Sequence, residues 1–296
     1  MIEKQIIENL GFKSLNPIQE AMLRCKADNR ILLAPTGAGK TLAYLLPALR
    51  RVRQGAKAVQ VIIIAPSREL ALQIDTVFRS TKSGESISCV YGGHSIHTEK
   101  RSLEYNPTFV VATPGRLLDH LSHHNIDCST VTHLIFDEFD KLLELGFSEE
   151  ISEIVSLLPS VRYRTLTSAT STIDYPDYIA AHPFETIDFL TGKASGELTV
   201  VKIQCSREER LAKLIDLLSV IGNEPTIIFC NFREQAEEVS DYLYDLHIES
   251  EYFHGGMEQF DRERSLTKFR NHSVNILVST DLAARGLDIP NIKHII

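Results

Sequence analysis

The feature that most constrains the fold of this 296-residue chain is a repeated alternation of short, β-branched apolar runs with longer segments of helical periodicity. This alternation is typical of a parallel sheet flanked by helices. Several runs carry no polar residue, as expected for strands that are buried on both faces. The predicted strands are residues 30–34, 59–65, 87–91, 108–113, 132–137, 165–168 and 186–189, and then 199–205, 226–230, 248–253, 274–279 and 292–296.

A small polar stretch, TGKASG at residues 191–196, interrupts the alternation and indicates a linker. We therefore expect two α/β domains, over residues 1–190 and 197–296. The length agrees, since a domain takes roughly 150 residues. The net charge is −8 and the pI is near 5.8. Bulk positive charge therefore cannot drive nucleic-acid binding, which would need local basic groups.

The five cysteines include no C-x-x-C pair, which predicts free thiols in a reducing compartment, with neither disulfides nor a zinc site. The apolar runs are far shorter than the roughly 20 residues that cross a bilayer. The N-terminus lacks the positive start and apolar stretch of a signal peptide. These observations favour a cytoplasmic protein without a membrane partner, and we expect it to be a monomer.

The sequence APTGAGKT lies between a predicted strand and a helical stretch. A glycine-rich turn in this position lets backbone N–H groups converge on phosphate oxygens, with Lys40 at the β and γ phosphates and the Thr41 hydroxyl on Mg²⁺. The strict pattern has glycine where Ala34 stands. The predicted phosphate-binding residues are Ala34, Pro35, Thr36, Gly37, Ala38, Gly39, Lys40 and Thr41.

Two further segments complete a nucleotide site. In HLIFDEFD, strand residues lead into Asp137, which can hold Mg²⁺ through water, and Glu138, which can orient and deprotonate the attacking water. Upstream, the amide of Gln19 can pair with the adenine edge. The alternatives are an acidic surface turn for the carboxylates and an ordinary helix-capping role for Gln19.

Further short motifs follow in a fixed order: PSREL at 66–70, a glycine pair at 92–93, TPGR at 113–116, SAT at 168–170, IIFCN at 227–231, Gln259 with Arg262, and STDLAARGLDIP at 279–290. With the nucleotide segments, they resemble the DEAD-box ATP-dependent RNA helicases over nearly the whole chain. The resemblance implies two tandem RecA-like domains, each a mostly parallel sheet flanked by helices, that close over ATP and RNA. It implies binding of the RNA backbone, and local unwinding of duplexes or remodelling of ribonucleoproteins with ATP hydrolysis.

The resemblance also implies roles for individual residues. The catalytic set is Lys40, Thr41, Asp137, Glu138, Ser168 and Thr170, the last two linking hydrolysis to strand separation by bonding with Asp140. Arg285, Gly286 and Asp288 resemble the segment that completes the ATP site. The RNA-binding set is Pro66, Arg68, Gly92, Gly93, Thr113, Gly115, Arg116, Arg262, Thr280 and Asp281.

Two departures from the family pattern stand out. Phe139 replaces alanine in the family tetrapeptide, so we expect activity with some repacking near SAT. The chain stops at Ile296, before the arginine motif that contacts the γ phosphate, so the second domain is expected to be truncated and hydrolysis weak, since such an arginine contributes on the order of 10³ or more in rate. The alternatives are an ATP-gated RNA clamp or scaffold with little turnover, and a DNA-directed helicase.

Overall fold

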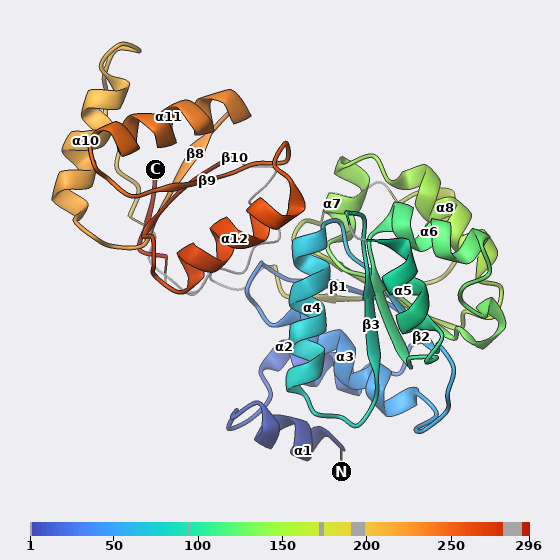
Figure 1. The fold of residues 1–296 in the computed structure, drawn as a ribbon. Coiled ribbons are helices and arrows are strands. Elements are labelled where there is room, and N and C mark those ends of the chain that lie inside the picture. Colours follow the sequence, from blue (N-terminus) through green and yellow to red (C-terminus); the bar gives the residue numbers. More distant parts are fainter. Residues whose placement is uncertain (1, 94, 172–174, 191–198, 281–291) are drawn as a thin grey trace. The chain divides into compact units, whose positions relative to one another are not determined.

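A computed structural model describes residues 2–93, 95–171, 175–190, 199–280 and 292–296. The chain divides into two compact units, Met1–Ala194 and Ser195–Ile296 (Figure 1). Each unit is an α/β structure whose strands pair in parallel. The predicted fold class is confirmed.

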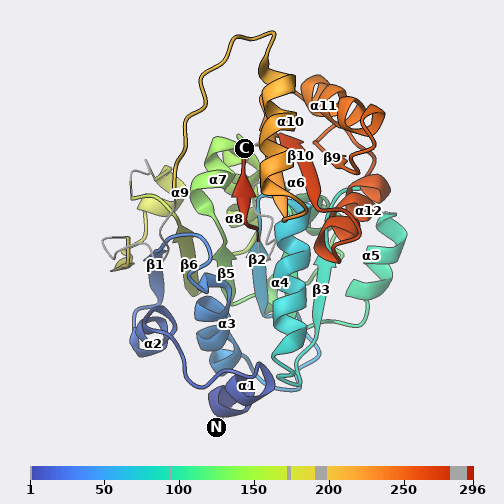
Figure 2. The same ribbon diagram turned by 90° about the vertical axis from the view of Figure 1, so that its left-hand side faces the viewer.

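The first unit is built on a seven-stranded sheet in the order β3-β4-β2-β5-β6-β1-β7. Figure 2 shows β1, β6, β5, β2 and β3 in this succession. All seven predicted strands are present, with shifts of a few residues at their ends. Their bounds are β1 Asn29–Leu33, β2 Val61–Ile64, β3 Ile87–Val90, β4 Phe109–Ala112, β5 His133–Phe136, β6 Tyr163–Ser168 and β7 Glu185–Asp188.

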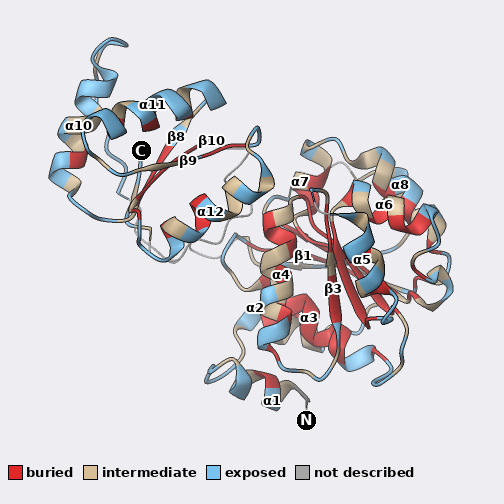
Figure 3. Cartoon of the chain, viewed as in Figure 1, coloured by how far each residue is buried: buried red, intermediate tan, exposed pale blue. Residues whose placement is uncertain are grey.

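Helices cover both faces of this sheet and create two apolar cores. Along β2, Val61 and Ile63 face one core, and Ile62 and Ile64 face the other. Figure 3 shows the strands buried beneath their helices. The first core is covered by α1 Ile2–Asn9, α2 Pro17–Arg24, α3 Lys40–Arg51 and α4 Arg68–Ser80. The second core is covered by α5 Ile96–Leu103, α6 Pro114–Ser122, α7 Phe139–Glu144, α8 Ser148–Leu157 and α9 Asp177–Ala180, and a short 3-10 helix, η1 Cys128–Thr130, lies between α6 and β5.

The second unit has a four-stranded parallel sheet in the order β11-β8-β10-β9. Its elements are α10 Arg210–Ile221, β8 Thr226–Cys230, α11 Arg233–Asp245, β9 Glu251–Phe253, α12 Gln259–Arg270, β10 Ile276–Thr280 and β11 His294–Ile295. Helices α10 and α11 pack on one face, and α12 packs on the other.

The strand predicted at residues 199–205 is wrong. The segment joins no ladder among the described residues, and the side chains of Val200 and Val201 are 82% and 75% exposed. Alternating apolar residues alone do not make a strand, because the backbone also needs a neighbouring strand edge to pair with.

The parallel topology brings the functional segments of the first unit to one edge of the sheet. Each predicted segment follows the carboxyl end of a strand, where ligands of α/β proteins bind. The phosphate loop and the Asp137 and Ser168 segments follow the neighbouring strands β1, β5 and β6. The three RNA-binding segments follow β2, β3 and β4, which also lie side by side. No helix among the described residues combines the length and apolar character needed to cross a membrane.

Candidate nucleotide and nucleic-acid site

The phosphate loop forms a tight turn between β1 and α3. Gly37 and Gly39 adopt φ angles of 73° and 81°, which side chains with a Cβ rarely adopt. Helix α3 begins at Lys40 without a side-chain cap, so its first N–H groups point to the loop without a capping partner. Lys40 is buried, and its Nζ donates to the carbonyl of Ala34 at 2.9 Å. This cradle suits an anionic ligand at a helix N-terminus.

Gln19 supports the same loop from α2. It completes a capping box with Asn16. The Gln19 backbone N–H donates to Asn16 Oδ1 at 2.9 Å, and the side-chain oxygen Gln19 Oε1 accepts from the Asn16 backbone N–H at 3.0 Å. Gln19 Nε2 also reaches the Gly39 carbonyl at 3.5 Å. A Cβ at position 39 would lie 2.9 Å from Gln19 Nε2 and would displace that amide, and the φ of 81° independently favours glycine. The capping role is therefore present, and adenine recognition by Gln19 stays a prediction.

Asp137 is a buried carboxylate that accepts three hydrogen bonds. It is 3% exposed. Its Oδ2 accepts a hydrogen bond from the Tyr44 hydroxyl at 2.9 Å, and its Oδ1 accepts from Thr167 Oγ1 at 2.5 Å and from the Glu138 N–H at 3.2 Å. Sequence reasoning missed Tyr44 and Thr167. Tyr44 lies one helical turn after Lys40, and Thr167 is the penultimate residue of β6, the strand beside β5, so spacing and topology could have indicated both.

Burial governs the electrostatics of the two carboxylates. It raises the pKa of Asp137 above its ordinary value, against the opposing hydrogen bond from Thr167 and the charge of Lys40. It also raises the pKa of Glu138 to about 7, assisted by the neighbouring charge of Asp137. Two acidic groups in this setting attract cations, because a nearby positive charge offsets both the free-energy cost of burying their negative charges and their mutual repulsion.

The donor set fits a Mg²⁺ ion. A carboxylate offers about four lone-pair positions, and three of those on Asp137 are used by Tyr44, Thr167 and the Glu138 N–H. A position on Oδ2 therefore remains for a metal-bound water, and the Thr41 hydroxyl adds a second hard oxygen donor. Mg²⁺ prefers such oxygen ligands and keeps several of its waters.

The segment after Asp137 turns sharply. Glu138 adopts a left-handed conformation with φ of 50°, which is uncommon for a residue with a side chain and is found at functional sites. Phe139 is fully buried; its ring lies edge-on to Phe136 at 5.4 Å and stacks on Tyr175 at 6.1 Å. Phe139 thus forms an aromatic cluster with Phe136 and Tyr175.

The SAT segment joins this turn through Asp140. Thr170 Oγ1 donates to Asp140 Oδ2 at 3.4 Å, which is the bond expected from the sequence. Ser168 Oγ donates to the Thr170 carbonyl at 2.7 Å and accepts from the Thr170 N–H at 2.9 Å. The other oxygen of Asp140, Oδ1, is buried without a partner among the described residues.

The RNA-binding residues predicted in the first unit gather at the ends of β2, β3 and β4. A Cβ at Gly92 would lie 3.4 Å from Nη2 of Arg68, so the guanidinium lies against the glycine turn. Arg116 Nη1 donates to Glu99 Oε2 at 2.5 Å. Gly93 and Gly115 are exposed, and the N-terminus of α6 has no side-chain cap at Thr113. Pro66 is buried behind them.

In the second unit, Thr280 ends β10 beside Cys230 of β8. The Arg262 guanidinium lies over the Phe253 ring at 4.9 Å. Asp281, Arg285, Gly286 and Asp288 lie outside the described residues.

Sequence reasoning also missed a repeat of the first unit's geometry in the second unit. A Cβ at Gly256 would lie 3.4 Å from Arg233 Nη1, as it would at Gly92 from Arg68. In both units the arginine follows a strand within the sequence R-E, and a Gly-Gly pair begins two residues after the end of the next strand along the chain. This repeated order of R-E and Gly-Gly was the available signal.

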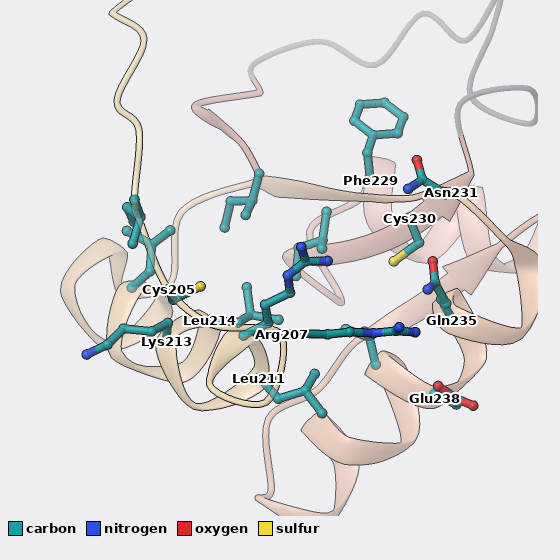
Figure 4. A pocket seen from close by; sticks show the side chains of 16 residues that line it. Cys205, Arg207, Leu211, Lys213, Leu214, Phe229, Cys230, Asn231, Gln235 and Glu238 are labelled. Carbon is teal, nitrogen blue, oxygen red and sulfur yellow. The ribbon is translucent and has the colours of Figure 1, made fainter.

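The second unit also has a separate pocket of about 460 Å³. Figure 4 shows it with Leu211 and Leu214 of α10 on one side and Cys230 with Gln235 on the other. None of the predicted ATP- or RNA-binding residues is among its described lining residues.

Comparison with known proteins places the chain in a family. The DEAD/DEAH box helicase model matches residues 16–177, and the helicase conserved C-terminal domain model matches residues 209–296. The chain is 33% identical over 292 residues to the DEAD-box ATP-dependent RNA helicase RhpA of Helicobacter pylori. This match covers 96% of the chain, which spans 59% of the length of that relative.

Solved structures agree with this assignment. S. cerevisiae Dbp5 bound to RNA and ADP BeF3 has a TM-score of 0.85 at 23% identity, covering 99% of this chain and 77% of Dbp5, a likeness in fold. A DEAD box protein from Methanococcus jannaschii has a TM-score of 0.58 at 27% identity, covering 98% of this chain and 80% of that protein. By its family models, its sequence relatives and its fold, the chain belongs to the DEAD-box RNA helicase family.

Proposed function

We propose that this chain binds ATP with Mg²⁺ at the β1, β5 and β6 edge of the first unit and binds RNA along the β2, β3 and β4 edge. We also propose that it uses ATP hydrolysis to unwind short duplexes or to remodel ribonucleoprotein complexes. The observation that carries the proposal is the convergence of the phosphate loop and Asp137, joined by the bond from Tyr44 on α3. The names of the relatives, which are ATP-dependent RNA helicases, support the same activity.

Each group at the nucleotide edge has a task in this proposal. The loop amides and Lys40 hold the triphosphate, and Thr41 with Asp137 would hold Mg²⁺, which neutralises phosphate charge during transfer. Glu138 positions the attacking water and accepts its proton. Ser168 and Thr170 connect this chemistry to the turn at Asp140.

RNA recognition in this proposal depends on a few backbone and arginine N–H groups at defined positions instead of on bulk positive charge. The net charge of −8 argues against binding driven by bulk positive charge. Exposed glycines, the N-terminus of α6 and the guanidinium groups of Arg68 and Arg116 can bind phosphates, which fixes the strand without reading bases. The similar arrangement of Arg233 with Gly256 adds a phosphate contact in the second unit.

The test is ATP hydrolysis with and without single-stranded RNA, in the parent chain and in Glu138→Gln. We expect RNA to stimulate hydrolysis in the parent, and Glu138→Gln to retain ATP and RNA binding while losing turnover. Glu144→Gln is the control, because Glu144 ends the short helix α7 that follows Glu138 and forms a half-exposed ion pair with Lys141. ATP-dependent RNA binding without turnover in the parent would indicate a clamp instead, and equal stimulation by DNA would indicate a DNA-directed enzyme.

A further inference from the structure

A buried carboxylate on α5 joins the segments that we propose to bind RNA. Glu99 is 6% exposed and accepts hydrogen bonds from three directions. Its Oε1 accepts from the backbone N–H of Tyr91 at 2.9 Å. Its Oε2 accepts from Arg116 Nη1 at 2.5 Å and from His120 Nε2 at 3.0 Å. The donors come from the end of β3 and from the first and last turns of α6.

The chain of bonds continues behind Glu99 and orients the histidine. His120 has no exposed surface, and its Nδ1 accepts from Asn125 Nδ2 at 3.1 Å. With Nδ1 accepting, Nε2 carries the ring proton that is donated to Glu99. Both ring nitrogens of His120 are thus paired, and these two bonds fix the orientation of the Nε2–H that donates to Glu99.

The other side of the network reaches the edge itself. Tyr91 precedes the Gly92–Gly93 turn, and Gly92 lies against the Arg68 guanidinium. Glu99 therefore connects the turn after β3 directly to Arg116, and through Gly92 to Arg68 after β2. Segments from three strands depend on one side chain of α5 for their relative placement.

We propose that Glu99 is the positioning residue of the RNA-binding edge, holding Arg116 and the Gly92–Gly93 turn in the arrangement that receives a phosphate backbone. This proposal rests on the proposed RNA-binding function. Arg116 is 16% exposed in its side chain, and a guanidinium carries five N–H donors, so pairing with Glu99 is compatible with a contact to phosphate. Pairing with Glu99 limits its rotamers, so less conformational entropy is lost when RNA binds.

The charge state of Glu99 agrees with this role. Burial opposes its ionisation, but the hydrogen bonds from His120, the Tyr91 N–H and Arg116 outweigh burial and leave the pKa below its ordinary value. The carboxylate is therefore ionised at neutral pH and acts as an acceptor for all three donors.

Glu99→Gln tests the proposal with little change in shape. A glutamine side chain must turn its NH₂ group toward at least one of the three donors, so the network cannot be satisfied. We expect the affinity for single-stranded RNA to fall on the order of tenfold, as for the loss of one charge-assisted hydrogen bond. ATP affinity without RNA should stay unchanged, because the nucleotide edge lies on other strands, and the RNA concentration for half-maximal ATPase should rise while kcat changes little.

Glu251→Gln is the matched control. Glu251 is a largely buried carboxylate that accepts from Ser265 Oγ at 2.7 Å and from Lys268 Nζ at 2.5 Å, at the amino end of β9 in the second unit. Its substitution should leave RNA affinity within about twofold, because Glu251, Ser265 and Lys268 are not among the residues proposed to bind RNA and sites without shared partners act independently.

Arg116→Ala separates the failure of this proposal from the failure of the proposed function. If Glu99 acts through Arg116, the double variant Glu99→Gln with Arg116→Ala should bind RNA about as weakly as Arg116→Ala alone, since coupled residues are non-additive. Additive losses, or unchanged RNA affinity in Glu99→Gln when Arg116→Ala binds weakly, would overturn the positioning role. Unchanged RNA affinity in Arg116→Ala would instead contradict RNA binding at this edge.

A milder variant covers the case in which Glu99→Gln fails to fold, which a loss of ATP affinity would reveal. Asn125→Ala removes only the far end of the network and leaves Glu99 and Arg116 in place. We expect a two- to threefold loss of RNA affinity, roughly that of a neutral hydrogen bond acting at a distance. Unchanged RNA affinity in Asn125→Ala would then argue against the network.

Discussion

The hydroxyl of Tyr44 donates a hydrogen bond to Oδ2 of Asp137 at 2.9 Å, although the two residues are 93 positions apart. Tyr44 is 1% exposed and lies one turn after Lys40 on α3. The bond therefore ties the helix that follows the phosphate loop to the carboxylate at the end of β5. It fixes the position of Oδ2 and leaves the second lone pair of that oxygen for another partner.

Tyr44→Phe should destabilise the first unit by about 1 to 3 kcal/mol, because a buried charged acceptor loses its donor while the packing stays the same. Hydrogen exchange of the β5 amides measures the opening free energy of this unit. Tyr178→Phe is the control: Tyr178 is half-buried and its hydroxyl pairs with Ser148 Oγ at 3.2 Å. Equal protection in Tyr44→Phe and the parent would show that the bond contributes nothing.

Phe139→Ala should destabilise the protein by about 3 to 5 kcal/mol, the range for removing a fully buried aromatic ring. The ring of Phe139 contacts Phe136 and Tyr175, and alanine would leave a cavity between them. Thermal denaturation checks this. Phe232→Ala is the control, since Phe232 is 64% exposed and should cost under about 1 kcal/mol. A Phe139→Ala variant as stable as the parent would mean that the neighbours collapse into the space.

His133 should make the first unit less stable in mild acid. Burial, with Arg51 and Arg30 nearby, lowers the pKa of His133 from 6.5 to about 4. Between these values the unfolded chain binds a proton that the folded chain does not, so the free energy of unfolding falls with decreasing pH by about 1.4 kcal/mol per pH unit. The fall begins near pH 6.5 and ends near pH 4.

His133→Phe tests this dependence because a phenyl ring can keep the 4.5 Å stack on Tyr163 without titrating. Chemical denaturation between pH 7.5 and 5 should show a shallower loss of stability in His133→Phe than in the parent. His123→Gln is the control, since the side chain of His123 is 63% exposed. Identical slopes for His133→Phe and the parent would contradict the assignment.

Arg68 and Arg233 should make equivalent contributions to RNA binding. Each lost phosphate contact lowers the slope of log affinity against log salt by about 0.7 for a single strand. Arg68→Ala and Arg233→Ala should each show this decrease, measured by RNA titration over a range of salt concentrations. Lys213→Ala, which removes a charge paired with Asp216 on α10, should leave the slope unchanged. A decrease for Arg68 alone would refute the equivalence of the two units.

Much of the fold and of the nucleotide edge could be predicted because the signals are local. The apolar runs at β2 and β5 are buried on both faces, and the glycines of the phosphate loop adopt the conformations that their spacing indicates. The segment at 199–205 carried a similar local signal and is not a strand. Its pattern reports side-chain polarity alone, whereas a strand also requires a partner edge.

The sequence by itself determined where strands and helices lie and which short segments carry the chemistry, since these depend on residues close together in the chain. The tertiary structure alone decided which segments meet. Along the chain, the segments proposed to bind RNA, after β2, β3 and β4, interrupt those proposed to bind the nucleotide, after β1 and β5, but the strand order β3-β4-β2-β5-β6-β1 separates them into two halves of one edge. The bonds of Tyr44 and Thr167 to Asp137, and of Glu99 to Arg116, depend on the same order. Strand pairing is a non-local choice made by the packing of the whole sheet, so these contacts follow from the topology and not from local patterns alone.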